Sequence, residues 1–258
     1  MSEGHDPFDL AGRVAIVTGS TKGIGRAMVQ GLAAAGATVV VSSRKQDFCE
    51  KVAAEVEEST GSRAIGIACH VGDWDGVARF VSDVKECLGH IDVLVNNAGI
   101  NPARIGPGDM TLEYWRKVFS VNLEGPLRTS QLVAPIMREQ GGGSIINIAT
   151  MAAYSGGAPI CAYGASKAAL VNLTKSMAQE WAAWKVRVNA LAPGPFASEM
   201  VEGAESQQPG FKAMIAEGTY MRRIADPSEI VGPVVYLASD ASSFVTGDEI
   251  SVSGGMQK

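Results

Sequence analysis

The loop Thr18-Gly19-Ser20-Thr21-Lys22-Gly23-Ile24-Gly25 decides the fold of this chain. An apolar run typical of a buried strand, Val14–Thr18, leads into it, and a helical pattern over 23–35 follows it. Glycines at such a turn let a phosphate approach the backbone, and the helix start offers free N–H groups and a positive dipole end. The spacing differs from G-x-G-x-x-G and lacks the Gly-Lys-Ser/Thr of NTPase loops. The loop therefore predicts a dinucleotide-phosphate site, with a glycine turn that binds nothing as the alternative.

Short apolar runs and longer helical patterns alternate along the rest of the chain. Runs such as AIVT and VVVS are continuously apolar, which is typical of strands covered on both faces. We expect strands at Val14–Thr18, Thr38–Ser42, Ala64–Cys69, Asp92–Asn96, Ser144–Ile148, Val186–Leu191 and Glu249–Val252. We expect helices at 23–35, 45–58, 74–88, 111–139, 162–183 and 227–239. This order predicts an α/β fold: a single-domain, Rossmann-like, doubly wound parallel sheet of about seven strands with helices on both faces.

No linker or change of composition interrupts this order, so we expect a flexible leader at 1–11 and one domain at 12–258. Within the domain, the stretch 194–226 lacks periodicity and follows a strand end, where ligands bind in open α/β sheets. We favour a substrate loop or lid there, and a plain surface insertion is the alternative. Gly125-Pro126 inside the pattern 111–139 predicts a kink or break.

Composition excludes several classes of protein. The 258-residue chain has a net charge of −5 and no basic block, which argues against a nucleic-acid binder. The cysteines show no metal-ligand spacing and none of the three histidines makes a site, so we predict no metal. The start, MSEGHDPFDL, lacks signal-peptide features, and no apolar run is long enough to span a membrane. We expect a cytoplasmic protein without a membrane or nucleic-acid partner.

The end of the second predicted strand indicates which dinucleotide is bound. A fold that uses NAD usually places an acid there for the ribose 2′-hydroxyl, but this chain has Ser43 and Arg44, with Lys22 in the glycine loop. An arginine can hold a 2′-phosphate through two charge-assisted hydrogen bonds. We therefore predict NADP(H), the alternative being that Arg44 faces only water.

Tyr163 and Lys167 carry the predicted chemistry. They lie four residues apart at the start of a predicted helix, so they share one face. A nearby ammonium favours the phenolate and lowers the pKa of a tyrosine. Hydride transfer to a carbonyl needs a group that gives or takes a proton at oxygen, and such a tyrosine can do so. A surface Tyr/Lys pair would be the reading if the pair stood alone.

Five motifs make the chain resemble the short-chain dehydrogenase/reductase family: TGSTKGIG at 18–25, NNAG at 96–99, VNLEG at 121–125, YGASK at 163–167 and VNALAPG at 188–194. The resemblance implies that Lys167 bonds the nicotinamide ribose and that Asn122 holds a water in a proton relay. Asn97 would stabilise a strand end. The other residues expected at the cofactor are His70, Val71, Ala98, Gly99, Pro193, Gly194, Phe196 and Ser198.

Two residues depart from the family pattern. Thr150 occupies the place of a serine thirteen residues before the tyrosine. It keeps a hydroxyl that can hold the substrate oxygen, while its methyl group stiffens χ1 and crowds the site. We therefore assign the catalytic role to Thr150. His70 stands where many relatives have an aspartate, and we expect it either to contact adenine or to make a local strand-end hydrogen bond.

The sequence leaves the substrate open and favours an oligomer. The residues expected to face the substrate are mostly apolar, which favours a largely apolar carbonyl or alcohol: Ile100, Ala152, Tyr154, Ile160, Phe196 and Met200. Trp181 and Trp184 belong either to the core or to an interface, and we expect a homotetramer. We predict an NADP-dependent ketone or 3-oxoacyl-type reductase. The alternatives are a non-catalytic NADP(H)-binding sensor or scaffold, and a relative that catalyses dehydration or epimerisation.

Overall fold

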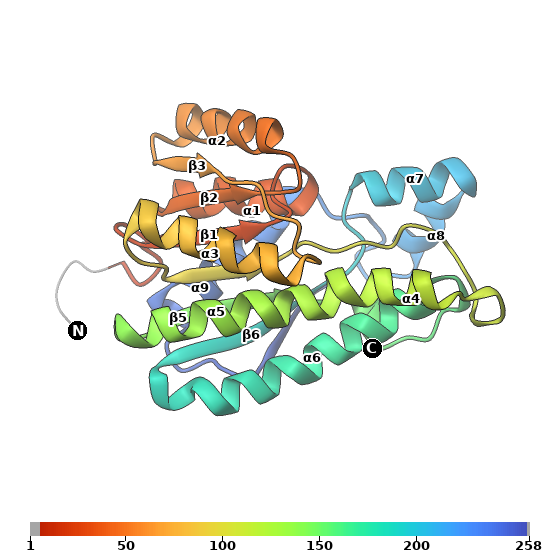
Figure 1. The fold of residues 1–258 in the computed structure, drawn as a ribbon. Coiled ribbons are helices and arrows are strands. Elements are labelled where there is room, and N and C mark those ends of the chain that lie inside the picture. Colours follow the sequence, from red (N-terminus) through yellow and green to blue (C-terminus); the bar gives the residue numbers. More distant parts are fainter. Residues whose placement is uncertain (1–5, 257–258) are drawn as a thin grey trace.

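The computed structural model describes residues 6–256 and confirms the predicted fold (Figure 1). Seven parallel strands form one sheet in the order β3-β2-β1-β4-β5-β6-β7. Their bounds are β1 Val14–Thr18, β2 Thr38–Ser42, β3 Ala64–Gly66, β4 Val93–Asn96, β5 Gly143–Ile148, β6 Val186–Pro193 and β7 Glu249–Val252. β3 is shorter than expected, although the Ile67 and Cys69 N–H groups continue to donate to the carbonyls of Val41 and Ser43.

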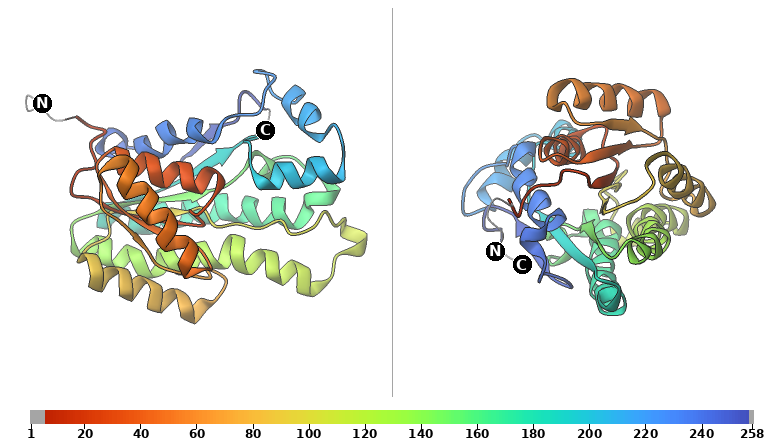
Figure 2. Two further views of the ribbon diagram at one scale, coloured as in Figure 1. Left: turned by 90° about the horizontal axis from the view of Figure 1, so that it is seen from above. Right: turned by 90° about the vertical axis from the view of Figure 1, so that its left-hand side faces the viewer.

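Helices cover both faces of the sheet (Figure 2). Their bounds are α1 Gly23–Ala34, α2 Gln46–Thr60, α3 Trp74–Leu88, α4 Leu112–Phe119, α5 Gly125–Glu139, α6 Cys161–Trp181, α7 Glu199–Gln207, α8 Phe211–Glu217 and α9 Val231–Ala238. One core cluster joins α1, α2 and α9 to the sheet, and the other joins α3, α5 and α6. In β1, Ala15 and Val17 enter the first cluster and Ile16 the second, so successive residues of one strand are buried on opposite faces.

The break predicted within 111–139 is present. α4 ends at Phe119, a π-helical turn follows over Ser120–Glu124, and α5 begins at Gly125. Two local causes account for it. Pro126 has no N–H to donate, and a Cβ on Gly125 would lie 2.8 Å from the Val71 carbonyl oxygen, so the chain turns closely against β3–α3.

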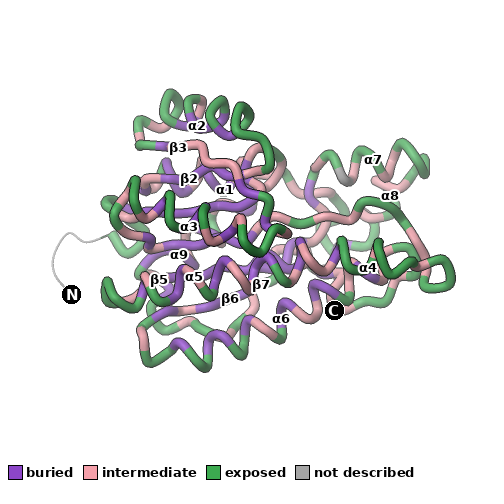
Figure 3. The backbone as a smooth tube through the Cα atoms, viewed as in Figure 1, coloured by how far each residue is buried: buried purple, intermediate pink, exposed green. Residues whose placement is uncertain are grey.

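The stretch 194–226 is not the irregular loop that the sequence predicts, because it contains α7 and α8. Ser198 caps α7 by accepting from the Val201 N–H, and Gly210 has a left-handed φ of 88° between the two helices. The two helices lie with α4 at one end of the molecule, and much of their surface is exposed (Figures 1 and 3).

Part of the segment 1–11, expected as a flexible leader, packs against the domain. Leu10 is fully buried in the core, and its N–H donates to the Ala35 carbonyl. The Ala241 N–H likewise donates to the Pro7 carbonyl, so residues 7–10 are tied to two distant parts of the fold. Residues 1–5 lie outside the described part. Between residues 6 and 256, no helix combines the length and apolar character that crossing a membrane requires.

Candidate active site

The glycine loop joins β1 to α1 in a shape that only glycines allow. Gly19 has a φ of 65°, and a Cβ on Gly25 would lie 2.4 Å from the Gly19 carbonyl oxygen. Gly23 has a φ of 55° and faces open space. Lys22, the N-cap of α1, provides no side-chain cap to the first N–H groups of the helix. An uncapped helix start beside open space fits the pyrophosphate of a dinucleotide.

Hydrogen bonds join the strand ends around this loop. The Asn97 amide donates to the carbonyls of Thr18 at 2.9 Å and Gly19 at 3.0 Å. The Thr18 hydroxyl accepts from the backbone N–H groups of Asn97 and Ala98, each at 3.1 Å. Asn97 therefore holds the end of β1 against the end of β4, as expected, and these bonds support the rim of the glycine loop.

The two cations expected at a 2′-phosphate have different surroundings. Arg44 is exposed at the end of β2. Lys22 forms an ion pair with Glu199, the first residue of α7. No motif in the sequence predicts that pair, because its two residues are 177 positions apart. It links the glycine loop to the helices of 194–226, so Glu199 joins the candidate site.

Lys167 is buried at the centre of the site. Its ammonium is in the second turn of α6, only 2% of the residue is exposed, and Nζ donates to the Ile148 carbonyl at 2.7 Å. Burial lowers the pKa of Lys167 to about 8, because the charged ammonium is removed from water. This lysine can therefore exchange a proton close to neutral pH.

The pKa of Tyr163 is raised, and this corrects the expectation that Lys167 would lower it. Burial of the phenol is the main cause, and a hydrogen bond with the Thr150 side chain partly offsets it. The Lys167 ammonium donates to the Ile148 carbonyl. The contact between Thr150 and Tyr163 is the relation that the family pattern predicts for the hydroxyl residue.

Asn122 lies in the π-helical turn and is completely buried. Its amide oxygen accepts from the Ile100 N–H at 2.8 Å, and its amide nitrogen donates to the Ile100 carbonyl at 2.9 Å and to Ser166 Oγ at 3.1 Å. A Cβ on Gly99 would lie 3.4 Å from Lys167 Nζ and 3.5 Å from Asn122 Oδ1, so these groups surround one point. The expected role of Asn122 in holding a water molecule stays a prediction. The role of Ser166 as a partner of Asn122 is not predicted from the sequence.

A buried network of polar side chains lies just behind the site, and it is not predicted from the sequence. The Asn96 amide donates to Asn147 Oδ1 at 2.9 Å and accepts from the Thr129 hydroxyl at 2.6 Å. Asn147 in turn donates to the Thr174 hydroxyl at 2.9 Å. The network joins β4, β5, α5 and α6 at the level where Lys167 meets Ile148.

Several predicted contact residues are used by the fold itself. The His70 ring accepts from the Gly72 N–H, which is the local strand-end bond offered as one of its two roles. Ser198 caps α7. Pro193 ends β6, and Gly194 donates to the Val252 carbonyl. Phe196 packs in the core with 5% of its surface exposed, and residue 196 forms a bridge with Ala225, so its contact with the cofactor or substrate stays a prediction.

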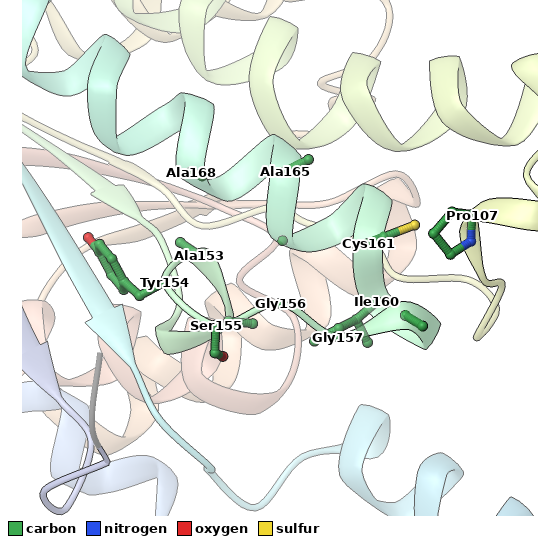
Figure 4. Close-up of a pocket in the computed structure, with 13 residues that line it drawn as sticks. Pro107, Ala153, Tyr154, Ser155, Gly156, Gly157, Ile160, Cys161, Ala165 and Ala168 are labelled. Atoms are coloured by element: carbon green, nitrogen blue, oxygen red, sulfur yellow. The ribbon is translucent and has the colours of Figure 1, made fainter.

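Three residues expected to face the substrate line one cavity of about 380 Å³ (Figure 4). Ala152, Tyr154 and Ile160 contribute to its wall, together with Cys161 and Pro107. Thr150, Tyr163 and Lys167 are not among the lining residues, so this cavity adjoins the catalytic group without containing it. The Met200 side chain lies outside the described residues.

Trp181 and Trp184 play different parts. Trp181 is buried in the second core cluster, whereas Trp184 lies in the turn after α6, half-buried, with Arg138 above its ring at 4.9 Å. The core reading therefore holds for Trp181. Across residues 6–256, no three His, Cys, Asp or Glu side chains group as metal ligands would.

Comparison with known proteins agrees with this geometry. Residues 19–257 match the family described as enoyl-(acyl carrier protein) reductase. Dehydrogenase/reductase SDR family member 4 of Homo sapiens is 38% identical, covering 97% of this chain and 89% of that protein. The 2-dehydro-3-deoxy-D-gluconate 5-dehydrogenase of Formosa agariphila is 37% identical, covering 97% and 95%. A gluconate 5-dehydrogenase of Burkholderia cenocepacia, solved with NADP and tartrate, is 34% identical with a TM-score of 0.92 and covers 97% of each chain.

The fold and the site together define an oxidoreductase that uses a nicotinamide dinucleotide. The glycine loop precedes an uncapped helix start, Thr150 interacts with Tyr163, and the buried Lys167 donates to the Ile148 carbonyl. The chain belongs to the short-chain dehydrogenase/reductase family.

Proposed function

We propose that this protein is an NADP(H)-dependent carbonyl reductase with Tyr163 as the proton donor. The proposal is carried by the side-chain interaction of Thr150 with Tyr163, together with the buried Lys167 one turn further along α6. A raised pKa keeps the phenol protonated at neutral pH, which suits a group that donates a proton during reduction.

The cofactor assignment rests on the rim of the glycine loop. Lys22, Ser43 and Arg44 would hold the 2′-phosphate, and no acid stands at the end of β2 to repel it. Solved relatives from Beutenbergia cavernae and Burkholderia cenocepacia contain NADP. Of the remaining residues expected at the cofactor, we retain His70, Val71, Asn97, Ala98, Gly99, Pro193, Gly194 and Ser198 as its lining.

Reduction would proceed with a simple division of labour. The bound cofactor supplies a hydride to the carbonyl carbon. As the C–H bond forms, the electron pair of the C=O π bond moves to oxygen, which accepts a hydrogen bond from Thr150 and takes the proton of the Tyr163 hydroxyl. Lys167, with a pKa of about 8, can return a proton to the phenolate. The product is a secondary alcohol.

The substrate class follows from the apolar residues around the site. Ile100 is fixed through its backbone by Asn122, and Ala152, Tyr154 and Ile160 line the adjoining cavity. These residues favour a largely apolar ketone or a 3-oxoacyl compound. Relatives include proteins named for sugar acids, so a substrate panel should contain both kinds. We regard residues 194–226, with α7 and α8, as the substrate lid.

We further propose a cytoplasmic homotetramer. Leu112 and Trp115 on α4 are exposed apolar residues, which suits burial against another copy of the chain. Light scattering at two protein concentrations tests the assembly: a monomer at both would reject it.

The activity test compares Tyr163→Phe with the wild type. Purified protein is offered NADPH and ketones from both classes, and absorbance of the reduced cofactor is followed. Turnover should fall at least about a hundredfold in the variant, as expected for loss of a general acid, while the thermal shift on adding NADPH persists. Equal turnover in the two proteins would reject the mechanism. A bound cofactor with no turnover on any ketone would favour the sensor alternative.

A further inference from the structure

Ser43, at the end of β2, is held by a buried thiol. The Ser43 N–H donates to Cys49 Sγ at 3.1 Å, and Ser43 Oγ lies 3.3 Å from the same sulfur. The sulfur also lies 3.7 Å from the Ser43 carbonyl oxygen. Cys49 is in the first turn of α2 and is completely inaccessible to solvent, so its side chain faces Ser43 and the core. Three polar groups of one serine thus surround one thiol.

We propose that Cys49 is a positioning residue that orients the Ser43 hydroxyl toward the cofactor 2′-phosphate and so contributes to the choice of NADP(H) over NAD(H). The inference rests on the proposed function, in which Ser43 and Arg44 receive that phosphate. Cys49 itself, being buried beneath Ser43, does not touch the cofactor.

Either side chain can donate in the contact between Ser43 Oγ and Cys49 Sγ, and one of the two arrangements suits a phosphate. The sulfur accepts the Ser43 N–H, and its one proton can go to Ser43 Oγ, which is closer than the carbonyl oxygen. A Ser43 oxygen that accepts from the thiol keeps its own proton for an outside acceptor. Phosphate oxygens are such acceptors, and hydrogen bonds to a charged group are the stronger kind.

Backbone contacts hold the residues Ser43 and Cys49 in place from two sides. A Cβ on Gly66 would lie 2.4 Å from the Cys49 carbonyl carbon, so β3 presses directly on α2 at this residue. The Cys69 N–H donates to the Ser43 carbonyl at 2.8 Å from the other side. Arg44 follows at the exposed rim, so the oriented hydroxyl and the guanidinium are adjacent in the chain.

The test is the ratio of kcat/KM with NADPH to kcat/KM with NADH. Cys49→Val keeps the volume of the side chain and removes the hydrogen bonds. We expect it to lower the ratio about tenfold, the effect of one hydrogen bond to a charged group, through KM for NADPH with kcat unchanged. Cys49→Ser keeps a donor and an acceptor and should stay within about threefold of the wild type. Cys69→Ala is the matched control, a neighbouring buried thiol that meets Ser43 only through its backbone.

An unchanged ratio in Cys49→Val would overturn the inference, and so would an equal loss with both cofactors, which a merely structural role predicts. If Cys49→Val fails to fold, Cys49→Ala measured the same way decides by the same criterion. Arg44→Ala separates this inference from the proposed function. A lowered ratio in Arg44→Ala with a wild-type ratio in Cys49→Val rejects only the role of the thiol, whereas wild-type ratios in both also reject the 2′-phosphate site.

Discussion

Replacing Thr150 with valine removes the hydroxyl and nearly preserves the shape of the side chain. In the structure the Thr150 side chain interacts with the Tyr163 phenol and lowers its pKa, and the hydroxyl accepts from the Ala152 N–H at 3.3 Å. Losing the bond to Tyr163 costs about 1 kcal/mol, and losing a bond to the substrate oxygen as it gains charge costs about 1.5–3 kcal/mol. Together about 2.5–4 kcal/mol of transition-state stabilisation is lost, so kcat/KM should fall about 10²- to 10³-fold.

The same change should alter the pH profile of the reverse reaction. The hydrogen bond from Thr150 lowers the pKa of Tyr163, so its loss lets that pKa rise further above its ordinary value. Alcohol oxidation needs the phenolate, and its rate should therefore increase only at higher pH in Thr150→Val than in the wild type. The assay follows NADP⁺ reduction from pH 7 to 10.5 with the best alcohol of the panel.

Thr150→Ser is the control, because it keeps the hydroxyl and removes only the methyl group; its kcat/KM should stay within about fivefold of the wild type. Thermal shifts with NADPH verify that all three proteins bind cofactor. The reasoning is refuted if Thr150→Val keeps more than a third of the wild-type kcat/KM, or if its oxidation profile moves to lower pH.

Three further outcomes are expected. Without cofactor, Lys167→Met should be more stable than the wild type at pH 7 by up to about 3 kcal/mol, since folding of the wild type at that pH buries an ammonium. The pKa of Lys167 is about 8 in the folded protein and 10.5 in the unfolded chain. The difference in stability should therefore disappear between pH 8 and 10.5. Urea unfolding at several pH values measures it, and a constant gap would contradict the pKa. In Gly25→Ala the added methyl group would lie 2.4 Å from the Gly19 carbonyl oxygen and displace the glycine loop. Titration should show NADPH binding weakened at least about tenfold. Unchanged affinity would show that the loop accommodates the methyl group. Asn122→Ala should lower the free energy of unfolding by about 2–4 kcal/mol, since the Ile100 N–H and carbonyl both lose their partner. A loss below about 0.5 kcal/mol in urea unfolding would contradict this prediction.

The sequence predicts the sheet well because its strands are buried on both faces. Five of the seven strands match within one residue at each end, since continuous apolar runs end abruptly at glycine or polar residues. The helices of 194–226 were missed for the opposite reason. α7 and α8 are nine and seven residues long and bury too little surface to need an apolar stripe.

At the site, residue identities could be predicted but their relations could not. Spacing along one helix indicates that Tyr163 and Lys167 share a face. It does not reveal that the Lys167 ammonium donates to the Ile148 carbonyl or that burial raises the pKa of Tyr163. The pair of Lys22 and Glu199 joins parts of the chain that only the tertiary fold brings together. The thiol beneath Ser43 carries no sequence signal, because most buried cysteines pack as small apolar groups.

The amide network behind the site constrains how this sequence can drift over evolutionary time. Asn96, Asn147, Thr129 and Thr174 satisfy one another inside the core. A substitution at one member leaves its neighbour with a buried polar group that has lost its partner, a penalty of about 1–3 kcal/mol. Such changes are tolerated more readily as compensated pairs than singly, so descendants of this chain should keep or exchange these residues together. Strong epistasis is expected between bonded partners that are up to 51 residues apart in sequence, as Asn96 and Asn147 are.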